Sequence, residues 1–442
     1  MASLATSAAE DVLYPAPRQG WIGVALFVLA IVIAYIDRQI LTLVVEPLRA
    51  AFAVSDAQIG MLQGFSIALL FAAMAMPIGR LIDIHNRRNI LIASVLFWSA
   101  MTLLCGFAQN FWQLFLFRLG VGLGEAGLYP AIYSMIADMF PPKRRMTANV
   151  VFYIGALLGA SVGISLGGAG IELLEDLRPT IPALSEHDLW RVVFVAAGAI
   201  GPVLALLLLA IREPSRKGLK VGEGRPRWRE LALHLRHEPR LYVPILLGTA
   251  LLGIADTGLI SWFPTVLVRT FGYSGGEAGI VMGVVLAFGS SAGVATAAVI
   301  ARELRARGRD DAFLCVVLTG ILMCAPATIF STVVAGRTTA LILFGFQIYA
   351  IFIANGLLPT IVQEISPNRF RGQIVALQYL CVYLLSGLGV VLVGHCSDLL
   401  STKGFGMAQA MALVILPAVA LAGAVFWYGA CAYRHRASQV SR

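Results

Sequence analysis

The stretch from Phe111 to Phe140 reads FWQLFLFRLGVGLGEAGLYPAIYSMIADMF, and its only charged side chains are those of Arg118, Glu125 and Asp138. The apolar core of a bilayer is about 30 Å thick and is crossed by about 20 predominantly apolar residues in a helix. This stretch is long and apolar enough to cross a membrane. It therefore predicts a transmembrane helix that carries charged groups into the membrane interior.

Apolar windows of similar length recur along the whole chain, separated by short polar breaks. Hydrophobic residues make up 59% of the chain and charged residues 13%, with a mean hydropathy of +0.83, whereas soluble domains contain about 25% charged residues. Composition therefore predicts an all-α polytopic membrane protein. We expect twelve transmembrane helices, at residues 21–46, 57–78, 89–108, 111–140, 147–171, 191–211, 241–268, 277–300, 312–334, 339–363, 374–396 and 405–431.

These windows form two groups of six on either side of a longer segment rich in charge, glycine and proline. Such a composition is typical of a linker. The first twenty residues lack the basic start and apolar core of a signal peptide. We therefore predict an N-terminal tail (1–20), an N-terminal six-helix bundle (21–211), a linker (212–240), a C-terminal six-helix bundle (241–431) and a C-terminal tail (432–442).

The lysines and arginines predict the orientation of the chain. Most of these 33 residues fall in segments that are cytoplasmic if the N-terminus is inside, and few fall in the opposite segments. Because cytoplasmic loops are enriched in lysine and arginine, we expect both termini in the cytoplasm. The sequence contains no N-x-S/T site and its loops are short, which favours a bacterial plasma (inner) membrane. The net charge of +9 is then explained by topology, and we expect no nucleic-acid partner.

The two halves of the sequence repeat each other. A shift of 219 places residues 274–279 on residues 55–60 and Asp256 on Asp37. A shift of 229 places Gln347 on Arg118 and aligns Gly356 and Pro359 with a glycine and a proline of the fourth helix. Parallel repeats of six helices are typical of transporters with a substrate cavity at the interface of the repeats.

Residues 79–88 read GRLIDIHNRR. This resembles the G-x-x-x-D-R-x-G-R-R signature of the major facilitator superfamily, with Ile84 and Asn86 in place of Arg and Gly. A basic loop that merely stops translocation is the alternative interpretation. The resemblance implies that Asp83 pairs with neighbouring helix ends and latches the cytoplasmic side when the transporter opens outward. The implied cytoplasmic gate comprises Gly79, Asp83, Arg87, Arg88, Asp138 and Arg145.

Charged residues inside a membrane are costly and are therefore functional hypotheses by default. This chain has five, namely Asp37, Arg38, Arg118, Glu125 and Asp256. At 1.5 Å per residue, Asp37 and Arg118 lie at a similar depth, while Glu125 lies deeper, roughly 10 Å from Arg118 along the same helix face. Arg38 is rotated about 100° from Asp37 and can turn toward Glu125, so the pairing stays open, and a purely structural ion pair remains an alternative.

Several motifs together resemble the Spinster branch of the superfamily. They are AYIDR (34–38), FWS (97–99), RLGVGLGEA (118–126), DMFP (138–141) with Arg145, and REP (212–214). The resemblance implies transport of amphiphiles such as lysophospholipids or sphingoid phosphates, with functional roles for Asp37, Arg38 and Glu125. The anion:cation symporter branch also shows an Asp-Arg pair in helix 1 and an Arg with a Glu-Ala-Gly run in helix 4.

The fifth helix contains a ladder of glycines at positions 155, 159, 163 and 167, which is typical of close helix packing. It lacks the Gly-Pro dipeptide of drug antiporters, which disfavours that mechanism. No phosphate-binding loop, metal-ligand spacing or nucleophile triad occurs in the sequence. Candidate cavity-lining residues are Tyr35, Tyr129, Tyr153, Gln347, Asn355, Gln378 and Tyr383.

The sequence therefore predicts a proton-coupled secondary active transporter of an amphiphilic or anionic, lysolipid-like solute that works by alternating access. Alternatives within the superfamily are an organic anion or sugar-acid symporter and a drug/proton antiporter. A lipid-modifying membrane enzyme or a receptor with the same fold are alternatives from other classes. We expect no enzymatic activity, cofactor or metal, and a monomer whose partners are membrane lipids, protons and a small organic substrate.

Overall fold

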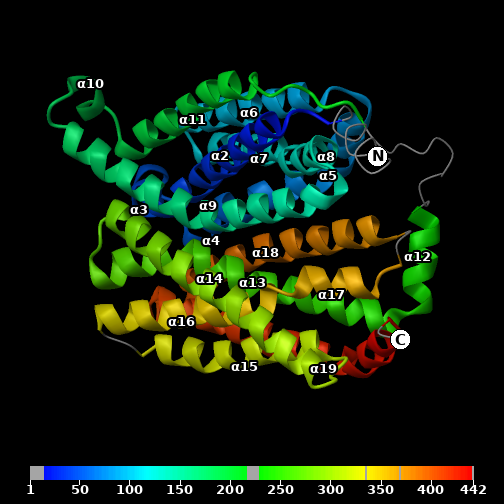
Figure 1. The fold of residues 1–442 in the computed structure, drawn as a ribbon. Coiled ribbons are helices and arrows are strands. Elements are labelled where there is room, and N and C mark those ends of the chain that lie inside the picture. Colours follow the sequence, from blue (N-terminus) through cyan, green and yellow to red (C-terminus); the bar gives the residue numbers. More distant parts are fainter. Residues whose placement is uncertain (1–13, 217–227, 334–335, 368–369, 441–442) are drawn as a thin grey trace. The chain divides into compact units, whose positions relative to one another are not determined.

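The structure is a computed structural model that describes residues 14–216, 228–333, 336–367 and 370–440. The regular structure of these residues is helical (Figure 1). Up to residue 208 the elements are α2 (Pro17–Leu43), α3 (Val45–Phe52), α4 (Asp56–Gly60), a π-helical turn (Met61–Phe65), α5 (Ser66–Ile84), α6 (Arg87–Cys105), α7 (Phe111–Glu125), α8 (Leu128–Met139), α9 (Pro142–Leu177), α10 (Pro182–Ser185) and α11 (Leu189–Leu208).

The remaining helices follow the linker. They are α12 (Trp228–His237), α13 (Pro239–Phe271), α14 (Gly275–Ala306), α15 (Ala312–Ser331), α16 (Arg337–Asn355), α17 (Leu358–Ile365), α18 (Arg371–Ser401) and α19 (Met407–Val440). Helix α12 lies within the predicted linker, part of which is outside the described residues. The last helix also extends beyond the predicted end of the C-terminal bundle at residue 431.

Among the described residues, ten helices are long and apolar enough to cross a membrane. The two other predicted spans, 57–78 and 111–140, are interrupted by the π-helical turn and by the break between α7 and α8. The second break has a local cause, because Pro130 has no N–H to donate to the carbonyl of Ala126. Pro359 stands in the same relation to Asn355, where α16 ends.

Several helices are longer than the apolar windows predicted. Helix α5 continues to Ile84, so Gly79 and Asp83 lie in a helix and not, as predicted, in a loop. Helix α9 spans Pro142–Leu177, against a predicted 147–171. The physical reason is that an apolar window ends where the membrane ends, whereas backbone hydrogen bonding continues into water.

The chain forms two compact units. Among the described residues, unit 1 contains 14–52, 69–216 and 275–283, and unit 2 contains 53–68, 228–274 and 284–440. Each unit therefore consists mainly of one predicted six-helix half plus a short segment from the other half. The tail, bundle and linker boundaries proposed from the sequence remain a prediction.

Unit 1 is held together by close helix packing. Helix α2 packs against α9, and α6 packs against α7 and α11. The core includes Phe27, Trp98 and Phe152, each at most 1% exposed. A Cβ atom added at Gly198 would lie 2.6 Å from the backbone nitrogen of Leu103, so α11 approaches α6 at a position that only glycine fits.

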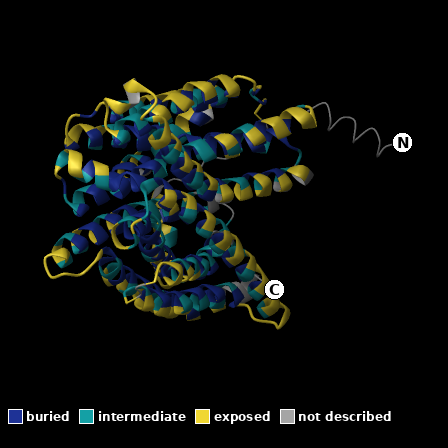
Figure 2. Cartoon of the chain, turned by 90° about the vertical axis from the view of Figure 1, so that its left-hand side faces the viewer, coloured by how far each residue is buried: buried dark blue, intermediate teal, exposed yellow. Residues whose placement is uncertain are grey.

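Unit 2 is built around α13, which packs against α18 and α19, while α15 packs against α16. The rings of Phe263 and Phe344 stack with centroids 3.6 Å apart, joining α13 to α16. Exposed residues recur along the helices and are not confined to loops (Figure 2). They include large apolar side chains such as Phe288, Leu322 and Trp427, each more than 70% exposed, as expected of surfaces that face lipid.

The contact between Gly198 and α6 predicts a stability effect. We expect Gly198→Ala to destabilise the protein by about 1–3 kcal/mol, because the new methyl group would overlap backbone atoms of Leu103. The apparent melting temperature of the purified protein in detergent measures this effect. Gly170 is the matched control, since an added Cβ there meets nothing within 4 Å. An equal melting temperature for the two variants would contradict the packing described.

Candidate functional site

Four of the five predicted intramembrane charges meet between α2 and α7 of unit 1. Arg38 on α2 forms an ion pair with Glu125 at the end of α7 through its Nη2 and the carboxylate Oε2. The side chain of Arg38 is 20% exposed and that of Glu125 only 1%. The guanidinium carbon of Arg38 also lies 5.6 Å from the ring centroid of Tyr35. Arg38 is thus the accessible member of this pair.

The second pair joins Asp37 to Arg118. Arg118 Nη1 lies 3.7 Å from Asp37 Oδ1 and 3.4 Å from the backbone oxygen of Asp37. Thr102 on α6 donates its hydroxyl hydrogen to Asp37 Oδ2. Arg118 is completely buried. Sequence reasoning left the pairing open, and it missed Thr102, because a single hydroxyl in an apolar helix carries no distinctive signal.

The geometry follows from helix periodicity. Adjacent residues on a helix point about 100° apart, whereas residues seven apart share one face. Asp37 and Arg38 therefore reach partners at two levels of α7, where Arg118 and Glu125 are two turns apart. The four side chains have no net charge when both acids are ionised, so each buried charge has an opposite charge beside it.

Neither pair uses all of its polar atoms. Glu125 Oε1, Asp37 Oδ1, and Nε and Nη2 of Arg118 are buried without a hydrogen-bond partner among the described residues. A saturated structural ion pair would have its remaining lone pairs and N–H groups satisfied. The cluster therefore retains the capacity to accept a proton or a further polar group.

Asp256, the fifth predicted charge, lies on α13 in unit 2. Asn355 Nδ2 is 3.4 Å from Asp256 Oδ2, and Oδ1 has no hydrogen-bond partner among the described residues. This is again a contact between the first and fourth helices of one half, but Asn355 corresponds to the residue after Glu125, and the neutral Gln347 corresponds to Arg118. Unit 2 thus carries the pseudo-equivalent carboxylate without the pseudo-equivalent arginine.

The predicted cavity-lining residues are distributed over both units. Tyr35 lies beside Arg38, and Tyr129 packs against the core of unit 1. Tyr153 is 46% exposed, and Tyr383 is partly buried. Gln378 is buried, and its Oε1 has no hydrogen-bond partner among the described residues.

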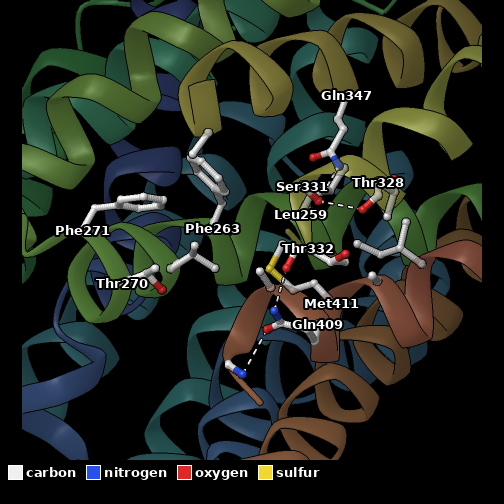
Figure 3. A pocket seen from close by; sticks show the side chains of 16 residues that line it. Leu259, Phe263, Thr270, Phe271, Thr328, Ser331, Thr332, Gln347, Gln409 and Met411 are labelled. Carbon is white, nitrogen blue, oxygen red and sulfur yellow. Dashed lines mark hydrogen bonds between the residues drawn. The ribbon is translucent and has the colours of Figure 1, made fainter. Parts of the chain in front are cut away.

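Gln347 lies in a cavity of about 260 Å³ inside unit 2, lined by residues of α13, α15, α16 and α19 and the segment before α19 (Figure 3). Gln347 Nε2 donates to Ser331 Oγ at 3.2 Å, and Gln409 Nε2 donates to the backbone oxygen of Thr332 at 2.7 Å. The lining residues carry hydroxyl and amide groups but no charged side chain. Gln347 therefore belongs to a neutral site within the C-terminal helices.

A second charged cluster joins the ends of α6 and α8 to the segment after α11, as part of the predicted cytoplasmic gate. Arg87 is 1% exposed and pairs with Asp138, with Glu213 at 2.8 Å, and with the backbone oxygen of Pro214 at 2.7 Å. Arg88 donates its backbone N–H to Glu213 at 2.9 Å. Sequence reasoning did not assign Glu213 to this cluster.

The structure shows fewer contacts for the other predicted gate residues. The side chain of Asp83 lies outside the described residues, and Gly79 has open space where a side chain would be. Arg145 Nε has no hydrogen-bond partner among the described residues. The structure therefore brings together Arg87, Arg88 and Asp138 of the predicted gate, while the role of Asp83 stays a prediction.

The corresponding helix ends of unit 2 carry a different cluster. Arg305 pairs with Glu364, whose Oε2 also accepts the hydroxyl of Tyr433 at 2.9 Å. Asp311 accepts hydrogen bonds from Arg309 at 3.0 Å and pairs with Arg434 at 2.8 Å. The hydrogen bond from Arg309 and the two positive charges hold the pKa of Asp311 below its usual range. The segment 302–311, which follows the eighth predicted span as 79–88 follows the second, lacks the signature but has its own ion pairs.

Comparison with known proteins assigns this arrangement of helices to a family. The sequence profile of the Major Facilitator Superfamily matches residues 27–390. The chain belongs to this superfamily. Its members are transporters and not enzymes, and the chain is accordingly a multi-pass integral membrane protein.

Within the superfamily the chain is Spinster-like. A solved bacterial homologue of the human lysosomal transporter Spinster, in an inward-facing and unoccupied conformation, has a TM-score of 0.79 at 26% identity and covers 96% of this chain and 98% of that one. The Sphingosine-1-phosphate transporter SPNS2 of Mus musculus is 27% identical, over 91% of this chain and 75% of its own length. An MFS-type efflux pump of Mycolicibacterium smegmatis is 29% identical, over 95% of this chain and 94% of its own length.

The resemblance predicted from the motifs is therefore confirmed at the level of family and branch. The helical major facilitator fold is confirmed as well, with ten candidate spans among the described residues. The chain is a secondary transporter of a small solute.

The buried Asp37–Arg118 pair predicts strong energetic coupling. We expect Arg118→Met to destabilise the protein by about 3–5 kcal/mol, because it leaves a buried carboxylate without its cation. Adding Asp37→Asn should recover most of this loss, since the remaining amide is neutral. Thermal unfolding of the single and double variants in detergent measures the coupling. The exposed Glu303–Arg307 pair is the control and should show almost none; additive losses at Asp37 and Arg118 would contradict the prediction.

Proposed function

We propose that this chain is a proton-coupled transporter of an anionic, lysolipid-like amphiphile that works by alternating access. The observation that carries the proposal is the Arg38–Glu125 pair, in which an accessible arginine is held by a buried carboxylate. The names of the Spinster-like relatives, which include a sphingosine-1-phosphate transporter, support the substrate class. Arg38 supplies the cation that such a headgroup requires.

Proton binding and substrate binding exchange at this pair. Protonation of Glu125 removes its negative charge and leaves Arg38 without its counter-ion, which is costly away from bulk water. An anionic headgroup then takes the place of the carboxylate on Arg38, where a charge-assisted hydrogen bond is available. Loss of the proton restores the Arg38–Glu125 pair and displaces the headgroup. Glu125 thereby couples the binding of the proton to the binding of the substrate.

The other charges have supporting roles in this proposal. Arg118 is fully buried, so with Asp37 it holds α2 against α7 rather than receiving the substrate. Asp256 has an amide partner and contributes to substrate affinity rather than to coupling. We further propose that the chain is a monomer in a bacterial plasma (inner) membrane. The distribution of lysine and arginine supports a cytoplasmic location of both termini.

Glu125→Gln tests the coupling. Because glutamine imitates the protonated acid, we expect the variant to bind or exchange substrate while losing transport driven by a pH gradient. Substrate flux into proteoliposomes, measured with and without an imposed proton gradient, is the readout. Glu303→Gln is the matched control, since it removes a carboxylate from an exposed Arg–Glu pair.

A Glu125→Gln protein that responds to the gradient like the parent would exclude Glu125 as the coupling site. Asp37 would then be the candidate, because it is the other buried carboxylate of the cluster. Loss of both exchange and gradient-driven flux in a folded variant would indicate that Glu125 is needed for binding itself.

Asp256→Asn separates affinity from coupling. We expect the concentration of substrate at half-maximal flux to change severalfold while the dependence of flux on pH is retained, because the aspartate has no cationic partner to release. Flux measured over a range of substrate concentrations at two pH values provides both quantities. The reverse result, an altered pH dependence at unchanged affinity, would assign a proton to unit 2.

The substrate class is tested by ligand-induced stabilisation, since a specific ligand raises the melting temperature by mass action. We expect sphingosine 1-phosphate and a lysophospholipid to stabilise the parent protein, and sphingosine without its phosphate to do so less. Stabilisation by a sugar acid alone would favour the organic anion symporter alternative. Stabilisation by cationic drugs alone would favour the antiporter.

A further inference from the structure

The cavity inside unit 2 has a polar wall and an apolar wall (Figure 3). It lies where two packed helix pairs meet, α13 with α19 and α15 with α16. The polar wall includes Thr328 and Ser331 on α15 and Gln347 on α16, whereas α13 and α19 contribute apolar side chains such as Phe263 and Met411. A molecule that fits this cavity therefore has one polar edge and one apolar face.

The hydroxyl groups of the polar wall meet the cavity as acceptors. Thr328 donates its hydroxyl hydrogen to the backbone oxygen of Cys324 at 3.0 Å, and Ser331 donates to that of Thr328 at 2.7 Å. Thr332, directly after α15, donates to the backbone oxygen of Ile329 at 2.7 Å. A hydroxyl group has one hydrogen and two lone pairs. These three oxygens can therefore accept a further hydrogen bond, but they have no hydrogen left to donate.

The amide of Gln347 has its orientation fixed by this arrangement. Its Nε2 lies 3.2 Å from Ser331 Oγ, and because the hydrogen of Ser331 is already used, the amide must present nitrogen and not oxygen there. Gln347 is 2% exposed, and its Oε1 accepts no hydrogen bond among the described residues. The polar wall therefore offers an unused amide acceptor to a donor inside the cavity.

The size and charge of the cavity limit what that donor can belong to. A single water needs about 10–15 Å³, and the volume of about 260 Å³ is many times larger. Every lining side chain is neutral, and burying an unpaired charge costs far more than burying a neutral hydroxyl group. The cavity is thus suited to an uncharged organic molecule with a hydrogen-bond donor at one end.

The helix ends next to the cavity are fixed by polar contacts that do not occupy it. Arg337 at the start of α16 donates to the backbone oxygen of Phe271 at the end of α13 at 2.7 Å, and its guanidinium carbon lies 4.2 Å from the ring centroid of Tyr273. Arg269 donates to both carboxylate oxygens of Asp56, at the start of α4, at 2.7 Å. The cavity is therefore preformed, as ligand sites usually are.

We propose that this cavity is a binding site for a small uncharged alcohol. Its hydroxyl group donates to Gln347 Oε1, and its apolar body packs against Phe263 and the apolar side chains of α19. Helices α13 and α15 end beside the cavity, and α16 and α19 begin there, so in the orientation proposed above the site lies toward the outer side. Binding here needs neither the Arg38–Glu125 pair nor a proton gradient.

Equilibrium dialysis of the full-length protein in nanodiscs tests the site, with empty nanodiscs as the measure of partition into lipid. The probes are phenethyl alcohol, its methyl ether and phenethylammonium, which share one apolar body. We expect the alcohol to bind about tenfold more tightly than the ether, the effect of one hydrogen bond to an unused acceptor. The ammonium should bind more weakly than the alcohol, because its charge has no partner. Equal affinities for the alcohol and the ether would overturn the proposal.

Two substitutions locate the binding. Gln347→Leu should lower the affinity for the alcohol about tenfold and leave that for the ether unchanged, because only the acceptor is lost. Ala412→Phe should abolish binding of both probes, since Ala412 lines the cavity and the larger side chain fills it. Gln378→Leu is the matched control, because it removes a buried glutamine of α18 that does not line the cavity.

Melting temperatures show which variants are folded, and Gln347→Leu suffices if Ala412→Phe does not fold. Binding that survives Ala412→Phe in a folded protein would overturn the proposal. So would an equal loss of affinity in Gln347→Leu and Gln378→Leu, which would indicate a general effect of removing a buried amide. Glu125→Gln should bind the alcohol like the parent whatever its flux, so this inference and the proposed proton coupling can fail separately.

Discussion

A charge buried in apolar surroundings must have an opposite charge beside it, and this constraint orders unit 1. Asp37 and Arg38 are adjacent on α2, and they can be compensated only where another helix presents an acid and a base two turns apart. Helix α7 does so with Arg118 and Glu125. The register of α2 on α7 is therefore set by electrostatics as well as by packing. Unit 2 repeats the helices, but it has the neutral side chain of Gln347 where unit 1 has Arg118.

This difference between the halves has a chemical meaning. A paired charge can exchange its partner for a proton or an anion, whereas a neutral hydroxyl or amide site offers hydrogen bonds and apolar surface. Unit 1 thus holds the paired charges on which the proposed proton coupling rests. Unit 2 holds a neutral cavity around Gln347, and Asp256, the pseudo-equivalent of Asp37, lies there beside an amide. An amphiphile likewise combines a charged headgroup with an apolar part.

Much of the fold could be predicted because apolar length is a local property of the sequence. The windows locate the spans, and the glycines and prolines of the two repeats align. The break after Glu125 was missed, because hydropathy does not register a lost hydrogen bond at Pro130. The far ends of α5 and α9 were missed because a helix continues in water without apolar residues.

The candidate site shows a similar division. Asp37, Arg38, Arg118 and Glu125 were found because charge is rare in such windows, but their pairing depends on side-chain rotation that sequence does not encode. Sequence analysis did not single out Asp56, at the start of α4, or Asp398, on α18, because acids near helix ends are common and cost little in water. Only the folded chain shows that Asp56 is buried and bound to a residue 213 positions away.

That separation has a consequence for biogenesis. When the second membrane helix enters the bilayer during synthesis, Arg269 has not yet been made, and Asp398 follows still later. The contacts of Asp56 with Arg269 and Asp398 can therefore form only after these later segments have been translated. The N-terminal helices can assemble early around their own ion pairs, but the fastening of residue 56 belongs to the last stage of maturation.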